Sequence, residues 1–191
     1  MNVARQMDRV DIVAEMREAA ADFRGLLDNA TSAELRRGSD GTKWSNEQLL
    51  FHMLFGDLVV RRLLPLVRVL GRMPEGVSRR FAAVLNSGTR PFHVVNYLGS
   101  LGGARVLGHA GMERTFDRMV NGLAGSLLAA SESDLARGMH FPTGWDPYFQ
   151  DYMTLPDVYH YATQHSRHHR RQLPLSAVGG PGQGPGAEPT P

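Results

Sequence analysis

The clearest indication of the fold is the stretch Trp44-Ser45-Asn46-Glu47-Gln48-Leu49-Leu50-Phe51-His52-Met53. Ser45 and Gln48 have the spacing of a capping box, in which each side chain bonds to the other residue's backbone N–H and a helix begins. The tryptophan before this start can pack on the first turns as a hydrophobic staple. Because the apolar residues continue beyond the box, we expect a helix over 46–70 that Pro65 bends.

Three other segments carry apolar residues at helical spacing, and they predict helices over 10–27, 104–130 and 155–173. Thr154 offers capping chemistry at the start of the last one, and Pro174 stops it. Glycine and proline punctuate the connection 71–103, which predicts one or two short helices there. No segment alternates with a period of two residues, so we expect no strands.

Four amphipathic helices predict an all-α four-helix bundle with extra short helices between the second and third. The length of 191 residues and the hydrophobic content of 42% suit one domain, which we place at 1–175. Residues 176–191 are rich in glycine and proline without periodicity, and we expect them to form a disordered tail.

Composition excludes several function classes. The chain has no cysteine, which removes disulfide scaffolds, thiol nucleophiles and cysteine-based zinc modules. Its 21 Lys and Arg nearly balance its 19 Asp and Glu, which argues against a dedicated nucleic-acid-binding protein. The chain begins without a secretory pattern, and its apolar runs are interrupted well short of the roughly 18 residues of a membrane span. We therefore expect a soluble, cytoplasmic protein with neither a membrane nor a nucleic acid as partner.

Histidines supply the one recognisable chemical pattern. On an ideal helix His169 lies about 40° around from His165 and one turn along, so both rings can meet at one point, whereas His160 lies about 140° away. His168 could also pair with His165, but further from the apolar face of the helix. His52 belongs to an apolar run, where a lone buried imidazole would cost roughly 1–3 kcal/mol. A metal shared by His52, His165 and His169 removes that cost and leaves coordination positions open, as catalytic sites do; a hydrogen-bonded core cluster is the alternative.

The two histidine regions carry a resemblance. Trp44 to Met53, followed much later by His165-x-x-x-His169-Arg170-Arg171-Gln172-Leu173, resembles the DinB/YfiT-like superfamily of metal-binding bundles, over about residues 8–173. The resemblance implies an up-down-down-up bundle in which His52, His165 and His169 hold Zn, Ni or a similar divalent ion. A small residue is common in the family where Arg171 stands, which makes the transfer of a substrate from any one relative unsafe.

The family includes hydrolases and S-transferases that join thiols such as mycothiol or bacillithiol to electrophiles, and mycothiol-dependent maleylpyruvate isomerase is related. The resemblance thus implies a metal-dependent enzyme acting on a small electrophilic molecule, with a low-molecular-weight thiol as cosubstrate. Hydrolysis and a non-catalytic metal- or ligand-binding bundle are the alternatives. A bundle of this size can also form a homodimer.

Other residues are expected around the metal. No general base is visible, because Glu47 and Asp57 each lie about 140° around the helix from His52. This lack favours a thiol over water, since a thiol ionises with less help. The residues that we expect behind the ligands or in the pocket wall are Gln48, Tyr161, His109, Trp145 and Gln172.

Overall fold

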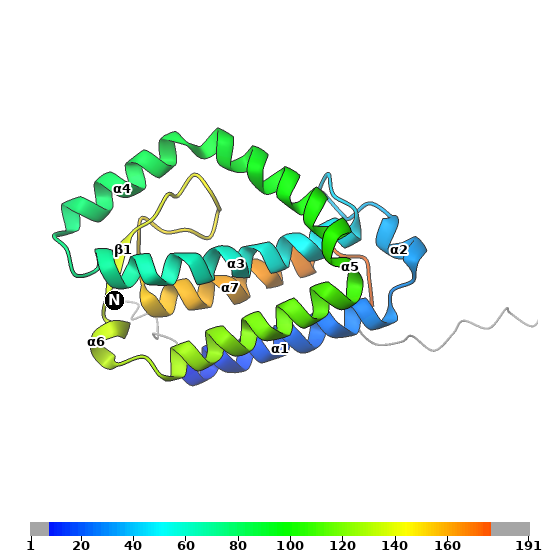
Figure 1. The fold of residues 1–191 in the computed structure, drawn as a ribbon, viewed down its shortest axis with the longest axis horizontal. Coiled ribbons are helices and arrows are strands. Elements are labelled where there is room, and N and C mark those ends of the chain that lie inside the picture. The colour runs from blue at the N-terminus through cyan, green and yellow to red at the C-terminus, as the bar shows by residue number, and fades with distance from the viewer. Residues whose placement is uncertain (1–7, 177–191) are drawn as a thin grey trace, which may run out of the picture.

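The structure is a computed structural model, and it describes residues 8–176. Four long helices make up most of it (Figure 1). They are α1 (Arg9–Asn29), α3 (Asn46–Leu70), the second part of α5 (Thr89–Leu128) and α7 (Leu155–Arg170). Helix α3 packs on α5 and α7, and α1 packs on the same two helices. In Figure 1, α1 and α7 run from left to right and the other two run back, so the predicted up-down-down-up bundle is confirmed.

Local capping starts the helices where the sequence predicts. The hydroxyl of Ser45 accepts from the backbone N–H of Gln48, and the Gln48 side chain accepts from the N–H of Ser45 at 3.0 Å. Thr154 and Asp157 form the same kind of box at the start of α7. Helix α3 then continues through Pro65 to Leu70. The indole of Trp44 stacks on the ring of His52, with centroids 4.3 Å apart.

The connection between the second and third bundle helices is itself helical. It contains α4 (Glu75–Ser87) and the first part of α5, which together arch over the bundle in Figure 1. Gly108 has φ 59° and ψ 176° and breaks α5 into two parts. Only glycine adopts such a conformation readily, so this residue sets where the chain turns back into the bundle. The third bundle helix therefore does not begin at Ala104, because the expected start lies inside the arch.

The expectation of no strands is wrong at one place. Strands β1 (Gly138–His140) and β2 (Tyr152–Thr154) pair antiparallel, with Met139 opposite Met153. Three-residue strands are too short to produce a visible alternation in the sequence. This ladder clamps both ends of the loop 141–151, which lies between α4 and the bundle.

The remaining elements are short helices at the ends of the bundle, α2 (Ser32–Arg36) and α6 (Glu132–Leu135). None of the described helices is long and apolar enough to cross a membrane. The predicted tail lies, from residue 177 on, outside the described residues.

Candidate metal centre

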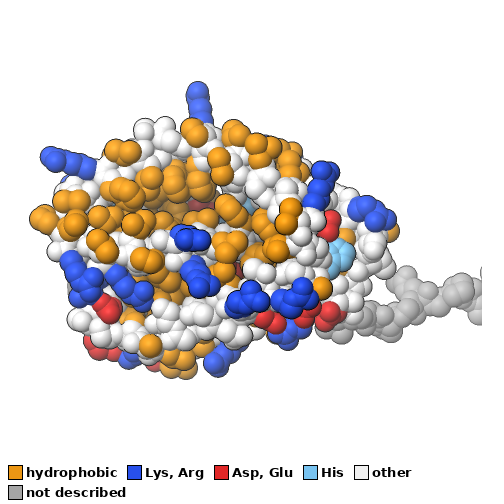
Figure 2. Space-filling view, viewed as in Figure 1, with side chains coloured by type: hydrophobic (Ala, Val, Ile, Leu, Met, Phe, Trp, Pro, Cys, Tyr) orange, Lys and Arg blue, Asp and Glu red, His pale blue; other side chains and the backbone are white. Residues whose placement is uncertain are grey.

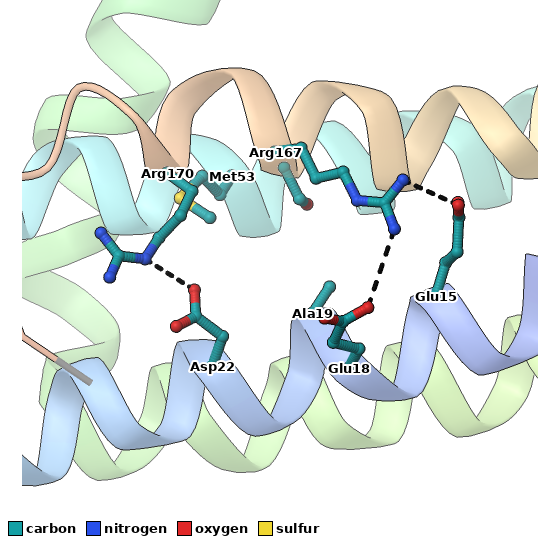
Figure 3. A pocket seen from close by; sticks show the side chains of 8 residues that line it. Glu15, Glu18, Ala19, Asp22, Met53, Arg167 and Arg170 are labelled. Atoms are coloured by element: carbon teal, nitrogen blue, oxygen red, sulfur yellow. Dashed lines mark hydrogen bonds and ion pairs between the residues drawn. The ribbon is translucent and has the colours of Figure 1, made fainter. Parts of the chain in front are cut away.

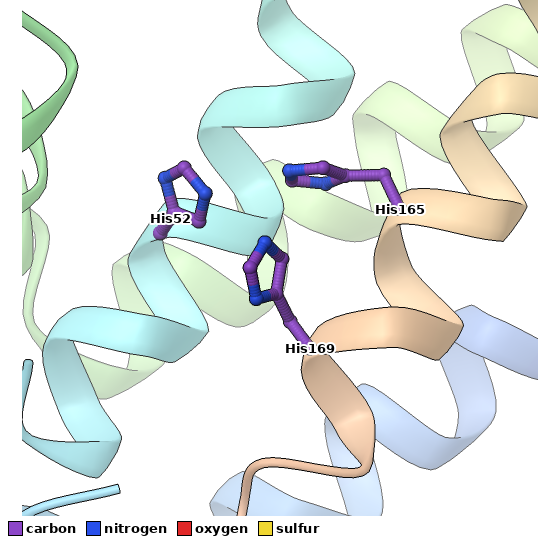
Figure 4. Close-up of side chains that lie close together, drawn as sticks. All are labelled: His52, His165 and His169. Atoms are coloured by element: carbon purple, nitrogen blue, oxygen red, sulfur yellow. The ribbon is translucent and has the colours of Figure 1, made fainter. Parts of the chain in front are cut away.

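Three histidines from two helices meet inside the bundle. His52 comes from α3, and His165 and His169 come from successive turns of α7 (Figure 4). One ring nitrogen of each lies within 4.8 Å of a ring nitrogen of the other two. The ring centroids are 4.6 to 5.1 Å apart. The structure therefore brings together the three residues that the sequence pattern selects as ligands.

A glycine on α3 permits this close approach. A Cβ built on Gly56 would lie 2.5 Å from Nδ1 of His165, which is closer than real contacts allow. Gly56 is one turn along α3 from His52, so the bare backbone at this point leaves room for the ring from α7. Sequence reasoning did not select Gly56, because the sequence around a glycine inside a helix does not indicate which side chain packs against it.

Two of the three histidines are almost completely shielded from water, and His169 is partly buried. His52 is 6% exposed and His165 is 3% exposed. Burial, helped by the neighbouring imidazole of His169, lowers the pKa of His52 to about 3. Burial lowers the pKa of His169 to about 4 and holds the pKa of His165 well below its usual value. All three rings are therefore neutral near pH 7, which is the form that binds a metal.

Hydrogen bonds orient two of the rings. Nδ1 of His169 lies 2.7 Å from Oε1 of Gln172, which can only accept, so Nδ1 carries the proton and Nε2 keeps its lone pair. Nδ1 of His52 lies 3.4 Å from the hydroxyl of Ser100. Since that hydroxyl donates to the carbonyl of Asn96, it accepts from His52 and leaves Nε2 of His52 free as well.

These observations agree with a divalent metal site. Three neutral imidazoles from adjacent helices, two of them with their second nitrogen bonded to a neighbour, form the donor set typical of zinc and related ions. Three protein ligands also leave room in the coordination shell for a molecule from solution. The residues present thus fit the metal that the resemblance implies.

A carboxylate that sequence reasoning missed lies beside the cluster. Oδ2 of Asp146, in the loop 141–151, lies 3.8 Å from Nε2 of His165 and accepts a hydrogen bond of 3.0 Å from the hydroxyl of Tyr161. Burial raises the pKa of Asp146. No general base was visible from the sequence, and the structure places this carboxylate beside His165. Helix geometry could not reveal Asp146, because the β1–β2 clamp and the loop place it.

Aromatic side chains surround the space next to His52, His165 and Asp146. The pocket lining includes Phe55, Val59, Phe92, Trp145, Phe149 and Tyr161. The indole of Trp145 stacks on Phe92 at 4.0 Å and donates to the carbonyl of Leu85, which ties the loop to α4 and α5. The Asn96 side chain also lines this pocket and interacts with His52, which opposes the effect of burial on the pKa of that histidine.

The other predicted surrounding residues separate into two groups. Trp145 and Tyr161 line the pocket, and Gln172 holds His169. Gln48 instead completes the capping box of α3. His109 is 42% exposed and lies 3.0 Å from a carboxylate oxygen of Glu47. The structure thus places Gln48 and His109 in roles outside the pocket, in local capping and in a surface pair.

A second cavity, of about 220 Å³, opens between α1 and α7 behind the cluster (Figure 3). Arg167 bridges Glu15 and Glu18, and Arg170 bonds to Asp22 at 2.7 Å. Every charged group of the lining is engaged in an ion pair, and three carboxylates against two guanidinium groups leave the cavity with an excess of one negative charge. We regard the ion pairs as links that hold α7, and with it two of the three histidines, against α1.

Comparison with known proteins gives one match. A family model described as the DinB superfamily matches residues 15–173, which includes all of the cluster. No curated protein matches the chain. No solved structure matches it either.

Proposed function

The chain belongs to the DinB superfamily, and on that basis we propose that it is a divalent-metal-dependent enzyme that joins a low-molecular-weight thiol to a small electrophilic molecule. The observation that carries the proposal is a cluster of three neutral histidines, two of which, His52 and His165, line an aromatic pocket that also contains a carboxylate. Zn or Ni is the ion that we expect there.

A bound divalent ion supplies Lewis-acid chemistry, which lowers the pKa of a thiol or of water. The thiol has to come from solution, because the chain contains no cysteine. Mycothiol and bacillithiol are the thiols to test first. The residues of the chain then have to bind the electrophile, exclude water and move a proton.

The pocket wall argues for an apolar electrophile. The rings of Phe55, Phe92, Trp145 and Phe149 offer faces and edges to a ligand. The free volume is only about 20 Å³, enough for about one water molecule. An organic substrate therefore has to displace the loop that carries Trp145, and the same loop would cover the substrate once it is bound.

Asp146 favours a second candidate, metal-dependent hydrolysis. Its Oδ2 can accept a proton from a nucleophile that enters between it and the histidines, while the Tyr161 hydroxyl holds the carboxylate in place. Water needs such a base more than a thiol does. Asp146 therefore weakens the argument for a thiol that rested on the lack of a base, and leaves the choice to experiment.

The decisive experiment has two steps. Elemental analysis of the purified protein should find close to one Zn or Ni per chain, and much less in the His52→Ala and His165→Ala variants. The metal-loaded protein is then given an apolar electrophile, such as an aryl epoxide or an aryl ester, with and without mycothiol or bacillithiol. A thioether or thioester product that requires the protein supports thiol transfer. Product formed from water alone supports hydrolysis, and bound metal without any turnover supports a binding protein.

A further inference from the structure

A second charged groove lies on the opposite side of α3 from the pocket, between α3 and the second part of α5. It encloses about 270 Å³ and is lined by Arg61, Arg68 and Ser126 as polar residues, over a floor that includes Leu64 and Leu123. Figure 2 shows Lys and Arg side chains along the line between these two helices. The groove is thus both apolar at its base and basic at its rim.

The two arginines of this groove are not neutralised. Arg61 and Arg68 are seven residues apart on α3 and therefore share one face. Nη1 of Arg61 contacts the sulfur of Met119 at 3.8 Å, and neither guanidinium has a carboxylate within ion-pair distance among residues 8–176. This differs from the cavity beside α1, where Arg167 and Arg170 are each paired with acidic residues.

Two neighbouring side chains fix the position of a serine hydroxyl in the same groove. Tyr159, which is completely buried, donates from its hydroxyl to Oγ of Ser126 at 2.8 Å. Nη2 of Arg68 donates to the same oxygen at 3.2 Å. Because both neighbours donate to Oγ, the hydroxyl proton of Ser126 remains free to bond to an acceptor. The groove thus presents two arginines about 10 Å apart along α3, with one neutral donor beside Arg68, and its polar lining side chains include no carboxylate.

We propose that this groove binds a small phosphate-bearing ligand, either free phosphate or a phosphomonoester. Guanidinium groups match the oxygens of phosphate in geometry as well as in charge, and a hydroxyl donor fits a third oxygen. The apolar floor leaves space for a small organic group on the ester. Residues 61–68 lie nine to sixteen positions beyond His52, or about 14–24 Å along the helix, so this site is separate from the histidine cluster.

Calorimetric titration of the full chain with inorganic phosphate, at constant ionic strength, tests the proposal. The wild type should bind about one phosphate per chain. The Arg61→Gln/Arg68→Gln double variant should bind at least about tenfold more weakly, and Ser126→Ala by a smaller factor. Arg62→Gln is the matched control, because this neighbouring exposed arginine does not line the groove and should leave the affinity unchanged.

Phosphate could also reach a metal at the histidines, and one variant separates the two sites. His52→Ala should keep full phosphate affinity if the groove is the site, whether or not the proposed enzyme function holds. Loss of binding in His52→Ala, or equal binding in the double arginine variant and the wild type, would overturn the proposal. Melting curves without phosphate establish that each variant is folded, since both arginines lie at the surface or only partly below it.

Discussion

Gly56 and His165 are in direct contact, and the imidazole of His165 occupies the space that a side chain at position 56 would take. The distance from an added Cβ to Nδ1 would be 2.5 Å, so no residue with a side chain is compatible with the present position of the ring. The close approach of the His165 ring to α3 therefore depends on this glycine.

The Gly56→Ala variant should lose most of its bound metal, because His165 has to move away from His52 and His169. Elemental analysis after purification measures this directly. Gly125→Ala on α5 is the control, since a Cβ there meets nothing within 4 Å. The control should keep its metal and gain about 0.5–1 kcal/mol of stability from the better helix propensity of alanine. Full metal content in Gly56→Ala would show that α7 can shift without cost to the site.

Gln172 should contribute to metal affinity without touching the metal. Its side-chain oxygen fixes the proton of His169 on Nδ1 at 2.7 Å, so Gln172→Leu leaves this ring free to turn. We expect metal affinity to fall about 10–100-fold, as is usual when the partner of a ligating histidine is removed. Competition with a chromophoric chelator measures the affinity. Gln164→Leu is the control, because this glutamine lies on α7 but outside the histidine cluster, and the variant should bind metal like the wild type.

Asp146 should matter for turnover more than for metal binding. In Asp146→Asn the side chain keeps its shape but can no longer accept a proton, so we expect turnover with water to fall about 10²–10⁴-fold. Turnover with a thiol should fall less. Rates with each nucleophile, together with metal content, test this. If Asp146→Asn retains wild-type hydrolysis, the carboxylate is not the proton acceptor. Tyr161→Phe, which only loosens the carboxylate, should have a smaller effect than Asp146→Asn.

Asp57 should make the fold less stable as the pH rises. This carboxyl group is 3% exposed, its Oδ2 has no hydrogen-bond partner in residues 8–176, and burial raises its pKa to about 8. The folded protein therefore keeps a proton that the unfolded chain loses near pH 4. Unfolding releases this proton between about pH 4 and pH 8, so the contribution of Asp57 to stability declines across that range.

The Asp57→Asn variant removes this titration and keeps the size of the side chain. It should be more stable than the wild type at pH 8, by an amount on the order of a few kcal/mol, and the difference should shrink toward pH 4. Denaturant unfolding of metal-free protein at several pH values gives the comparison. The exposed Asp28→Asn should show a nearly constant difference. A constant difference for Asp57→Asn as well would mean that the group is ionised in the folded state.

Short-range patterns in the chain were sufficient for the helices and for part of the site. The capping box at Ser45 and Gln48 depends on residues within one turn, and so does the box at Thr154. The pairing of His165 with His169 follows from helix periodicity alone. Such features are readable because the interacting groups are close in sequence, and so the helix geometry fixes their relation before any packing is known.

Contacts between distant segments were decided only by the tertiary structure. The β1–β2 ladder brings Asp146 to the cluster, Gly108 turns α5 back so that Ser100 lies beside His52, and Gly56 admits the ring of His165. The roles of Gln48 and His109 could not be predicted for the same reason: helix periodicity gives the face on which a residue lies but not the neighbour that it contacts. Which side chains meet depends on how helices and loops pack, and that packing depends on the whole chain.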